Sequence, residues 1–411
     1  MQRFSGFWLC ILVLFLAVPV SAADWNQWRG ANRDGVVETE MPETWPESLD
    51  RKWSVEIGTG HASPILIGNT IYQHSRLNDL ETVSALNVET GDVIWRDAYK
   101  ASYDMPNAAY SHGQGPKSTP LFADGAVYTL GISGVFSSYD AQSGKLRWRH
   151  DFVGEFPKPY PLFGTAMSPM SVDGSIIAHV GGQEGGELSA FDPKTGKRVW
   201  SWSSDGPSYA SPIVTQINEV RHLITQSEHN IISLDPTTGT LLWQIPYTTA
   251  YDQNIVTAAM DGDWVITSGL GNGVSAYHPV LKSNAWSPDR IWHNPDFSFY
   301  MASPVLHSGH IFGFSHHKKG QFFRLNGDTG ASVWASEGRQ TENASVVAAG
   351  DWLLWLTTEG RLFVTRADAD TFEPEATYSV SDSPVWAHLV VTDRGFLVKD
   401  ANTLSLWNIP E

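Results

Sequence analysis

The sequence contains 411 residues, of which 42% are hydrophobic, 12% are aromatic and only 17% are charged. This composition excludes intrinsic disorder, because ample apolar material is present to bury, and it also excludes a long coiled coil. Acidic residues outnumber basic ones by 44 to 27, and because a surface with a net charge of −17 repels phosphate, we expect no nucleic-acid partner.

Residues 1–22 have the pattern of a secretory signal peptide. Arg3 precedes an apolar run over residues 7–20, and the segment Val20-Ser21-Ala22 fits cleavage near Ala22. We therefore expect a periplasmic or secreted protein with no membrane span after cleavage, because no other segment approaches the ~20 apolar residues that a bilayer requires. The single cysteine, Cys10, lies in this leader, so disulfides and cysteine-ligated metals are not expected in the mature chain.

Residues 23–50 follow the leader and precede the first repeated unit. They open with Asp24-Trp25-Asn26-Gln27-Trp28-Arg29-Gly30, a run of aromatic, arginine and glycine residues. We interpret this segment as an N-terminal strap that lies over one face of the folded domain, and we assign it no chemistry. The folded domain itself is expected to span residues 51–411.

One pattern recurs throughout that domain. An alternating strand leads into an Asn or Asp turn with glycine, and a second strand carries tryptophan four residues after the glycine, as in Ala85-Leu86-Asn87 through Thr90-Gly91 to Trp95. Intervals of 42 to 53 residues separate the repeated tryptophans, which are Trp53, Trp95, Trp148, Trp200, Trp243, Trp292 and Trp334. A hairpin period of about 40 to 50 residues is typical of an all-β propeller with four antiparallel strands per blade.

The ends of the chain predict the number of blades. Tyr378 takes the tryptophan position in one further unit, and three strand-like runs follow it at residues 387–391, 395–399 and 403–407. Residues 52–56 supply the missing fourth strand, so that the two ends of the chain close the ring. We therefore predict eight blades, or seven if the Tyr378 unit is not a blade.

The repeated units resemble the pyrroloquinoline-quinone (PQQ) repeat of quinoprotein-type propellers over essentially the whole mature chain. The opening segment, Asp24 to Gly35, is similar to that of exported PQQ-like proteins of planctomycete-type bacteria. This resemblance implies that the repeated tryptophans pack between adjacent blades and are structural. The family includes PQQ-dependent dehydrogenases, which hold quinone and calcium in a central funnel, and non-catalytic BamB-like propellers, which bind partner proteins.

The loops that lead into the innermost strands are expected to gather around the axial channel. Five of these loops end in Ser-Pro or Thr-Pro, for example Ser63-Pro64 and Thr119-Pro120, where proline opens a strand without losing a ladder donor. Aromatic and polar residues in such loops are candidates for a small-molecule or peptide site, although they could equally serve as a plug. The candidate funnel residues are His61, His112, Lys117, Tyr160, Tyr209, Tyr251, Asn254, Tyr300, Asn343, Trp386 and His388.

We predict neither catalytic residues nor a metal site. Calcium binds six to eight oxygens, and the weak candidates are limited to Asp252, Asn254, Glu342 and Asn343. No nucleophile elbow, phosphate loop or dinucleotide fingerprint is present.

Three functions compete on this sequence. We favour an exported, non-catalytic and monomeric propeller that binds a protein or glycan partner and needs no cofactor. The alternative is a dehydrogenase that depends on PQQ and calcium, and a hydrolase or lyase ranks last because no catalytic pair can be placed in reach. The mature chain lacks the lipobox cysteine of the lipid-anchored BamB-like propellers, which argues against an identical role.

Overall fold

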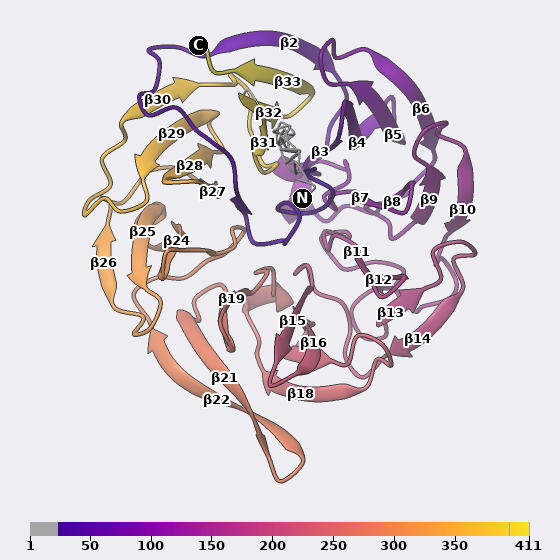
Figure 1. Cartoon of the computed structure of the whole chain (residues 1–411). Helices are drawn as coiled ribbons and strands as arrows, with labels where there is room; N and C mark the ends of the chain where they lie inside the picture. Colours follow the sequence, from indigo (N-terminus) through magenta and orange to yellow (C-terminus); the bar gives the residue numbers. More distant parts are fainter. Residues whose placement is uncertain (1–23, 394, 411) are drawn as a thin grey trace, which may run out of the picture.

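The computed structural model describes residues 24–393 and 395–410 and shows an eight-bladed β-propeller (Figure 1). This confirms the predicted fold class and the blade count. The only helical segments of the described chain are three short 3-10 helices, η1 (Asn107–His112), η2 (Ala250–Asp252) and η3 (His317–Lys319). The predicted signal peptide and Cys10 lie outside the described residues.

Each blade is an antiparallel sheet whose first strand lies innermost and whose last strand lies at the rim. The strands of the first four blades are β3 (Ile65–Ile67), β4 (Thr70–Leu77), β5 (Leu80–Asn87) and β6 (Val93–Tyr99); β7 (Leu121–Ala123), β8 (Ala126–Leu130), β9 (Phe136–Asp140) and β10 (Leu146–His150); β11 (Met170–Val172), β12 (Ser175–Val180), β13 (Glu187–Phe191) and β14 (Arg198–Trp202); and β15 (Ile213–Ile217), β16 (Val220–Gln226), β17 (Asn230–Leu234) and β18 (Leu241–Pro246).

The remaining four blades complete the ring. Their strands are β19 (Ala259–Asp261), β20 (Trp264–Ser268), β21 (Val274–Lys282) and β22 (Ala285–Asn294); β23 (Val305–His307), β24 (His310–Ser315), β25 (Gln321–Asn326) and β26 (Ser332–Ala335); β27 (Ala344–Ala349), β28 (Trp352–Thr357), β29 (Arg361–Arg366) and β30 (Ala376–Ser379); and β31 (Val390–Thr392), β32 (Gly395–Lys399), β33 (Thr403–Asn408) and β2 (Asp50–Glu56).

The last blade joins the two ends of the chain. Strand β2 pairs antiparallel with β33, with Trp53 opposite Leu406 and Glu56 opposite Thr403. The predicted closure by residues 52–56 is therefore confirmed. Sharing a blade between the two ends removes the free sheet edges that an open ring would leave.

The repeated tryptophans link each blade to the next at the rim. The indole Nε1 of Trp95 donates to Ala141 O at 2.8 Å, and that of Trp148 donates to Pro193 O at 2.9 Å. The turn glycine packs against the indole of the tryptophan in the preceding blade, where no larger residue fits: a Cβ added to Gly144 would lie 2.5 Å from Trp95 Cδ2. The same donation to a carbonyl of the next blade is made by Trp53, Trp200, Trp292 and Trp334.

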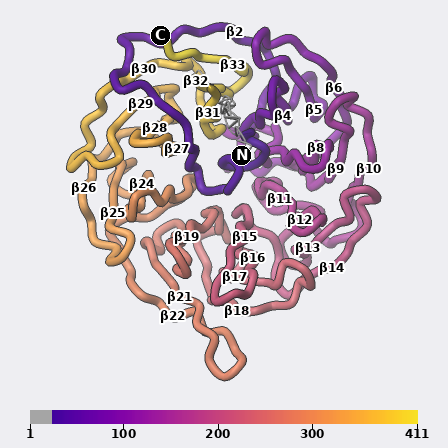
Figure 2. Tube along the Cα trace, in the orientation of Figure 1, coloured from indigo at the N-terminus to yellow at the C-terminus, as the bar shows by residue number. Residues whose placement is uncertain are grey.

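Trp243 is the exception, because the next blade lacks the short glycine turn. Strands β21 and β22 run on instead into a long hairpin that stands out from the ring (Figure 2). Trp243 Nε1 contacts His222 Nδ1 at 3.2 Å, and the His222 ring packs edge-on against Trp286 of the long hairpin. Trp243 thus occupies the repeated tryptophan position, but its indole bonds to a histidine of its own blade and not to a carbonyl of the next blade.

A second set of links surrounds the axis and explains the Ser-Pro and Thr-Pro pairs. The buried Thr119 hydroxyl accepts from Ser63 N at 3.1 Å, and Ser168 Oγ accepts in turn from Thr119 N at 3.0 Å. The same bond recurs from Ser168 N to Ser211 Oγ, from Thr257 N to Ser303 Oγ and from His388 N to Ser63 Oγ. The hydroxyl before proline is therefore an inter-blade acceptor near the channel, a role that the sequence pattern did not reveal.

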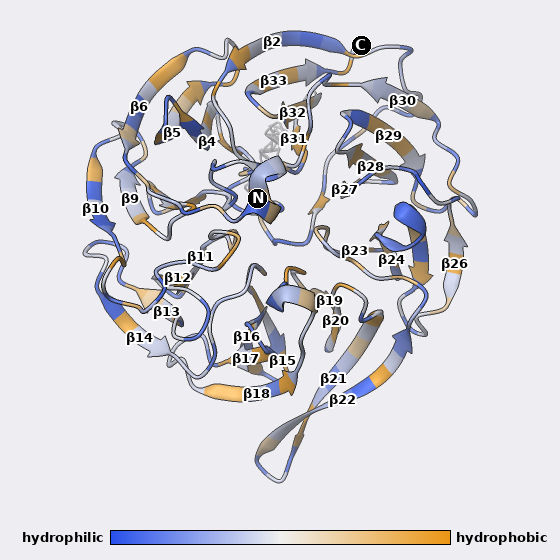
Figure 3. Cartoon of the chain, turned by 180° about the vertical axis from the view of Figure 1, so that it is seen from behind, coloured by the Kyte–Doolittle hydropathy of each residue, from blue (hydrophilic) through white to orange (hydrophobic). Residues whose placement is uncertain are grey.

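Residues 24–49 cross one face of the ring, from its centre to the rim strand β2 (Figure 1). Trp25 forms a bridge with Leu66, and β1 (Val36–Val37) adds to β27 as a parallel fifth strand. Seen from the opposite side, the outermost strands carry both hydrophobic and hydrophilic residues (Figure 3). Among the described helices, none has the length and apolar character needed to cross a membrane.

Candidate functional site

A cavity of about 550 Å³ lies at the centre of the ring, among the connections that enter the innermost strands. Eight of the eleven predicted funnel residues line it, and they come from six of these connections. These eight are His61, His112, Lys117, Tyr209, Tyr251, Tyr300, Trp386 and His388. Connections of different blades therefore bring distant parts of the sequence to one site.

The strap contributes to the wall of this cavity. Trp28 lines it, donates through Nε1 to Thr257 Oγ1 at 3.2 Å and lies 4.3 Å from the His388 ring between centroids. A role of the strap in the site was not predicted from the sequence. The sequence offered one sign of this role: Trp25 and Trp28 lie in a segment outside the repeats. Large aromatic side chains that are not part of a blade are expected to pack against another surface of the protein.

One side of the cavity combines aromatic rings with positive potential. The His61 ring stacks on Trp386 with centroids 5.5 Å apart, and His112 meets Trp386 edge-on at 4.7 Å. Lys117 Nζ donates to Phe163 O at 2.8 Å, and burial lowers the pKa of this amine to about 8. Burial and the nearby charge of Lys117 hold the pKa of His112 at about 4 and that of His61 well below 6.5. Both histidines are thus neutral at pH 7.

The wall also carries tyrosine hydroxyls. Tyr300 donates to Gln253 Oε1 at 2.6 Å, and the Tyr209 oxygen accepts from Phe163 N at 3.2 Å. Burial raises the pKa of both tyrosines, so their hydroxyls stay protonated and remain available as hydrogen-bond groups. Tyr251 stands at the mouth with 76% of its surface exposed and a left-handed backbone, φ = 61°. None of the described residues that line the cavity has a carboxylate side chain.

Three predicted funnel residues lie outside this wall. Tyr160 packs edge-on against Tyr103, and its hydroxyl accepts from Asp104 N at 3.0 Å. Asn254 is fully buried and uses its side chain to hold neighbouring backbone. Asn343 lines a separate cavity of about 40 Å³, which also borders Tyr300 and Trp386.

The four weak calcium candidates do not converge on one point. The Asn254 amide donates to Ser227 O, Glu228 O and Tyr247 O, its oxygen accepts from Thr249, and the residue is fully buried, so the side chain is used within the protein. Glu342 and Asn343 line the small side cavity, whereas Asp252 lies in η2 and borders neither cavity. This set does not provide the six to eight oxygens that calcium requires.

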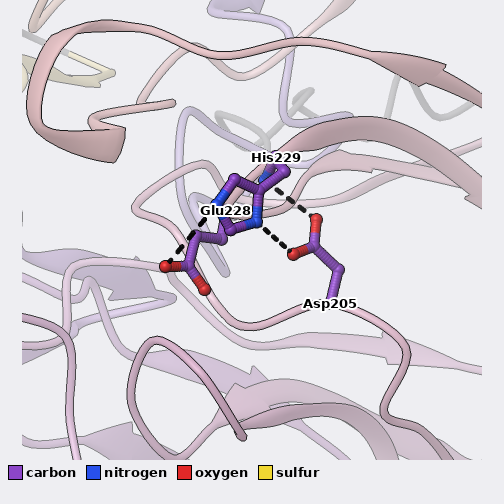
Figure 4. A group of neighbouring side chains, drawn as sticks. All are labelled: Asp205, Glu228 and His229. Carbon is purple, nitrogen blue, oxygen red and sulfur yellow. Dashed lines mark hydrogen bonds and ion pairs between the residues drawn. The ribbon is translucent and has the colours of Figure 1, made fainter.

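A different titratable cluster, missed by our sequence analysis, lies in the fourth blade and the connection that enters it (Figure 4). Asp205, Glu228 and His229 place their ligand atoms within 4.8 Å of one another, and His229 Nδ1 lies 2.8 Å from Asp205 Oδ1. The Asp205 carboxylate also accepts from Ser227 Oγ, His229 N and Asn230 Nδ2. Because the protein's own donors occupy both of its oxygens, we interpret the cluster as a clamp on the loop.

The chain is similar to BamB proteins over most of its length and to quinohemoprotein alcohol dehydrogenases over shorter stretches of sequence. The family model described as Outer membrane protein assembly factor BamB matches residues 79–336. The BamB of Burkholderia pseudomallei is 23% identical over 375 residues, which cover 80% of this chain and 91% of that protein. The quinohemoprotein alcohol dehydrogenase ADH-IIG of Pseudomonas putida is 30% identical over 130 residues, 32% of this chain but only 16% of the enzyme. The crystal structure of BamB from Moraxella catarrhalis superposes with a TM-score of 0.60 at 13% identity, covering 88% of this chain and 99% of that one.

Proposed function

The chain belongs to the family of the outer membrane protein assembly factor BamB, and from this premise we propose that it is an exported, non-catalytic propeller that binds a protein partner. Its central cavity receives an apolar segment of that partner with a carboxylate beside it. The N-terminal sequence pattern supports a periplasmic or secreted location. The observation that carries the proposal is the wall of the cavity, in which aromatic rings surround one buried lysine and no described residue is acidic.

Charge complementarity selects the carboxylate. The chain as a whole carries a charge of −17, yet the nearby charges of Lys117 and Lys399 both lower the pKa of His61 in the cavity wall. Burial destabilises the charged form of the Lys117 amine. An anionic group placed between Lys117 and the two neutral histidines would stabilise that charge again. The aromatic rings of Trp28, Trp386 and the tyrosines then supply contact area for the apolar part of the ligand.

A polypeptide fits these walls better than a glycan. Sugar hydroxyls need several fixed donors and acceptors, and the wall has few that are not already engaged: its single amide, Gln253, accepts from Tyr300, and the Tyr209 oxygen accepts from Phe163 N. Its other uncharged polar groups outside the rings are the hydroxyls of Ser211, Thr257 and Ser303, and Ser303 Oγ already accepts from Thr257 N. An apolar side chain next to a carboxylate makes no such demand.

The alternative is a PQQ- and calcium-dependent dehydrogenase, which the quinohemoprotein relatives favour. The cavity is large enough for a flat organic molecule. The residues present do not fit the accompanying calcium, however, because no described carboxylate lines the wall and the Asn254 amide is fully engaged. We therefore rank the binding propeller first.

Two titrations of the purified chain decide between these functions. The first uses short glycine-serine peptides that end in phenylalanine, with either a free or an amidated C-terminus. We expect saturable binding of the free acid, about tenfold weaker for the amide and for Lys117→Met, since one charged contact is lost. Lys145→Met, at an exposed turn position, is the matched control and should bind normally.

The second titration uses PQQ with calcium. Saturable one-to-one binding, followed by dye reduction with an alcohol, would replace our proposal by the dehydrogenase. Absence of binding for every peptide would also refute it. Equal affinity for the acid and the amide would refute the carboxylate.

A further inference from the structure

Tyr251 is the most exposed large apolar side chain in the described part of the protein, and it stands at the mouth of the central cavity. Tyr251 and the next residue, Asp252, both have a left-handed backbone, with φ of 61° and 52°, which residues other than glycine rarely adopt. Among the described residues, no other aromatic ring packs against Tyr251 and none bonds to its hydroxyl. Packing within the chain therefore does not explain an aromatic side chain at this place.

Hydrogen bonds hold the turn that presents this side chain. The backbone N–H of Asp252 donates to Thr249 O at 3.2 Å, and its carbonyl accepts from Ser208 Oγ at 3.1 Å. Thr249 Oγ1 donates in turn to the fully buried Asn254 side chain at 3.1 Å. The Tyr251 ring is thus held at the mouth before any ligand arrives, which lowers the entropy cost of a contact made there.

Asp252 brings a negative charge to the same place. Burial and, to a smaller extent, the charge of Asp252 raise the pKa of Tyr209, so that this carboxylate lies near the cavity wall without lining it. Its side chain is partly exposed, and no described residue forms an ion pair with it or donates a hydrogen bond to its oxygens. The Asp252 carboxylate is therefore free to pair with a cation from outside the chain.

The neighbouring segments at the mouth do not neutralise this charge. They contain neither lysine nor arginine, and they are residues 203–212, 227–230, 247–258 and 269–273. They carry three carboxylates, Asp205, Glu228 and Asp252, and one imidazole, His229, which already pairs with Asp205. Three carboxylates and at most one imidazolium leave a net charge of at least two negative units here at pH 7.

The mouth and the interior of the cavity thus differ in the sign of their charge. The wall holds Lys117, and none of the described residues in it is acidic, whereas the mouth beside Tyr251 is acidic and lacks basic residues. A ligand that is complementary to both parts carries an anion at its inner end and a cation further out. A peptide has this polarity when its terminal carboxylate enters first and a basic side chain precedes it.

We propose that Tyr251 and Asp252 bind an arginine or lysine side chain of the partner, located a few residues before the apolar residue whose carboxylate enters the cavity. The cation lies over the Tyr251 ring and pairs with the Asp252 carboxylate, and its aliphatic stem covers apolar surface at the mouth. This inference rests on the function proposed above and adds the class of partner segment that the cavity selects.

Glycine-serine peptides that end in phenylalanine test the inference, with arginine, glutamine or glutamate placed two, three or four residues before the end. In a buffer of low ionic strength, we expect arginine in at least one position to bind about fivefold more tightly than glutamine, and glutamate to bind more weakly. This preference should disappear in Asp252→Asn and shrink in Tyr251→Asn, since asparagine tolerates the left-handed backbone. Asp124→Asn, which removes an exposed carboxylate from the turn between β7 and β8, should keep it.

The outcomes separate this inference from the function on which it rests. Binding of the glutamine peptides with no gain from arginine at any position would overturn the inference and leave the peptide-binding function standing. A gain that survives unchanged in Asp252→Asn would also overturn it, because general attraction to a chain of charge −17 would then be the cause. If no peptide binds, the function proposed above is refuted and the inference with it.

Discussion

Replacing Lys399 by methionine changes the pH dependence of stability by an amount that follows from the structure. Lys399 lies in β32 and is 1% exposed, and its Nζ donates to Gly60 O, Asp400 O and Ala401 O. Burial lowers the pKa of this amine from 10.5 to about 8. Protonating the folded chain is therefore less favourable than protonating the unfolded one, and the penalty is fully present below pH 8.

The size of this penalty follows from the shift. A change of one pKa unit corresponds to about 1.4 kcal/mol, so the shift costs the wild-type chain about 3 kcal/mol at pH 7. Between pH 8 and 10.5 the unfolded state binds more protons than the folded state, and stability rises with pH. The penalty is nearly gone at pH 10.5. Lys399→Met has no such group and lacks this rise.

Urea unfolding of both chains between pH 7 and pH 10 measures the effect. We expect the free energy of unfolding of the wild-type chain to increase by roughly 2 to 3 kcal/mol relative to that of Lys399→Met over this interval. Lys145→Met removes an exposed lysine and controls for the general effect of charge. Parallel profiles for the wild type and Lys399→Met would show that this amine is not shifted and would refute the reasoning.

Three further substitutions test the ring and the loop clamp. Thr119→Val leaves a buried backbone N–H of the neighbouring blade without its acceptor and should cost about 1 to 3 kcal/mol in urea unfolding, whereas Thr119→Ser, which keeps the hydroxyl, should cost clearly less. Gly144→Ala forces a Cβ against a tryptophan ring at 2.5 Å, so it should destabilise by roughly 1 to 3 kcal/mol more than Gly174→Ala, which has a similar φ but open space. The hydrogen bond to Asp205 raises the pKa of His229 in the folded chain. This bond therefore stabilises the folded chain fully below about pH 6.5, the pKa of histidine in the unfolded chain, and the stabilisation is lost as the pH rises through the pKa of His229 in the folded chain. Unfolding free energies of His229→Gln and the wild type that stay parallel from pH 5 to 9 would contradict this.

The ring could be predicted from the sequence because its determinants are local and repeated. A turn such as Asn87 to Gly91 needs a side chain that caps its own backbone and a residue at positive φ, and Gly91 has φ = 75°. A tryptophan four residues after the glycine then bonds to the next blade, as Trp95 and Trp148 do. Each repetition of this short pattern strengthened the same conclusion.

The cavity was predicted only in part, because it is assembled from single, non-repeated connections. Position before an innermost strand was a sufficient signal for His61, Lys117 and Trp386. Position alone could not show that the Asn254 side chain turns inward to hold the backbone. Such a residue resembles a ligand-binding one in sequence, since both are polar and lie in a loop.

The strap was the largest gap, and its role follows from the shape of a propeller. Eight blades leave a channel at the axis, and the connections that enter the innermost strands present carbonyl groups there that need donors or water. A segment outside the repeats can fill this space and supply the donors: Arg29 and Arg33 bond such carbonyls, and Trp28 donates to the Thr257 hydroxyl. The repeats thus determine the ring, while the connections and the strap determine the chemistry at its centre, which is why two propellers of equal blade number can hold quite different ligands.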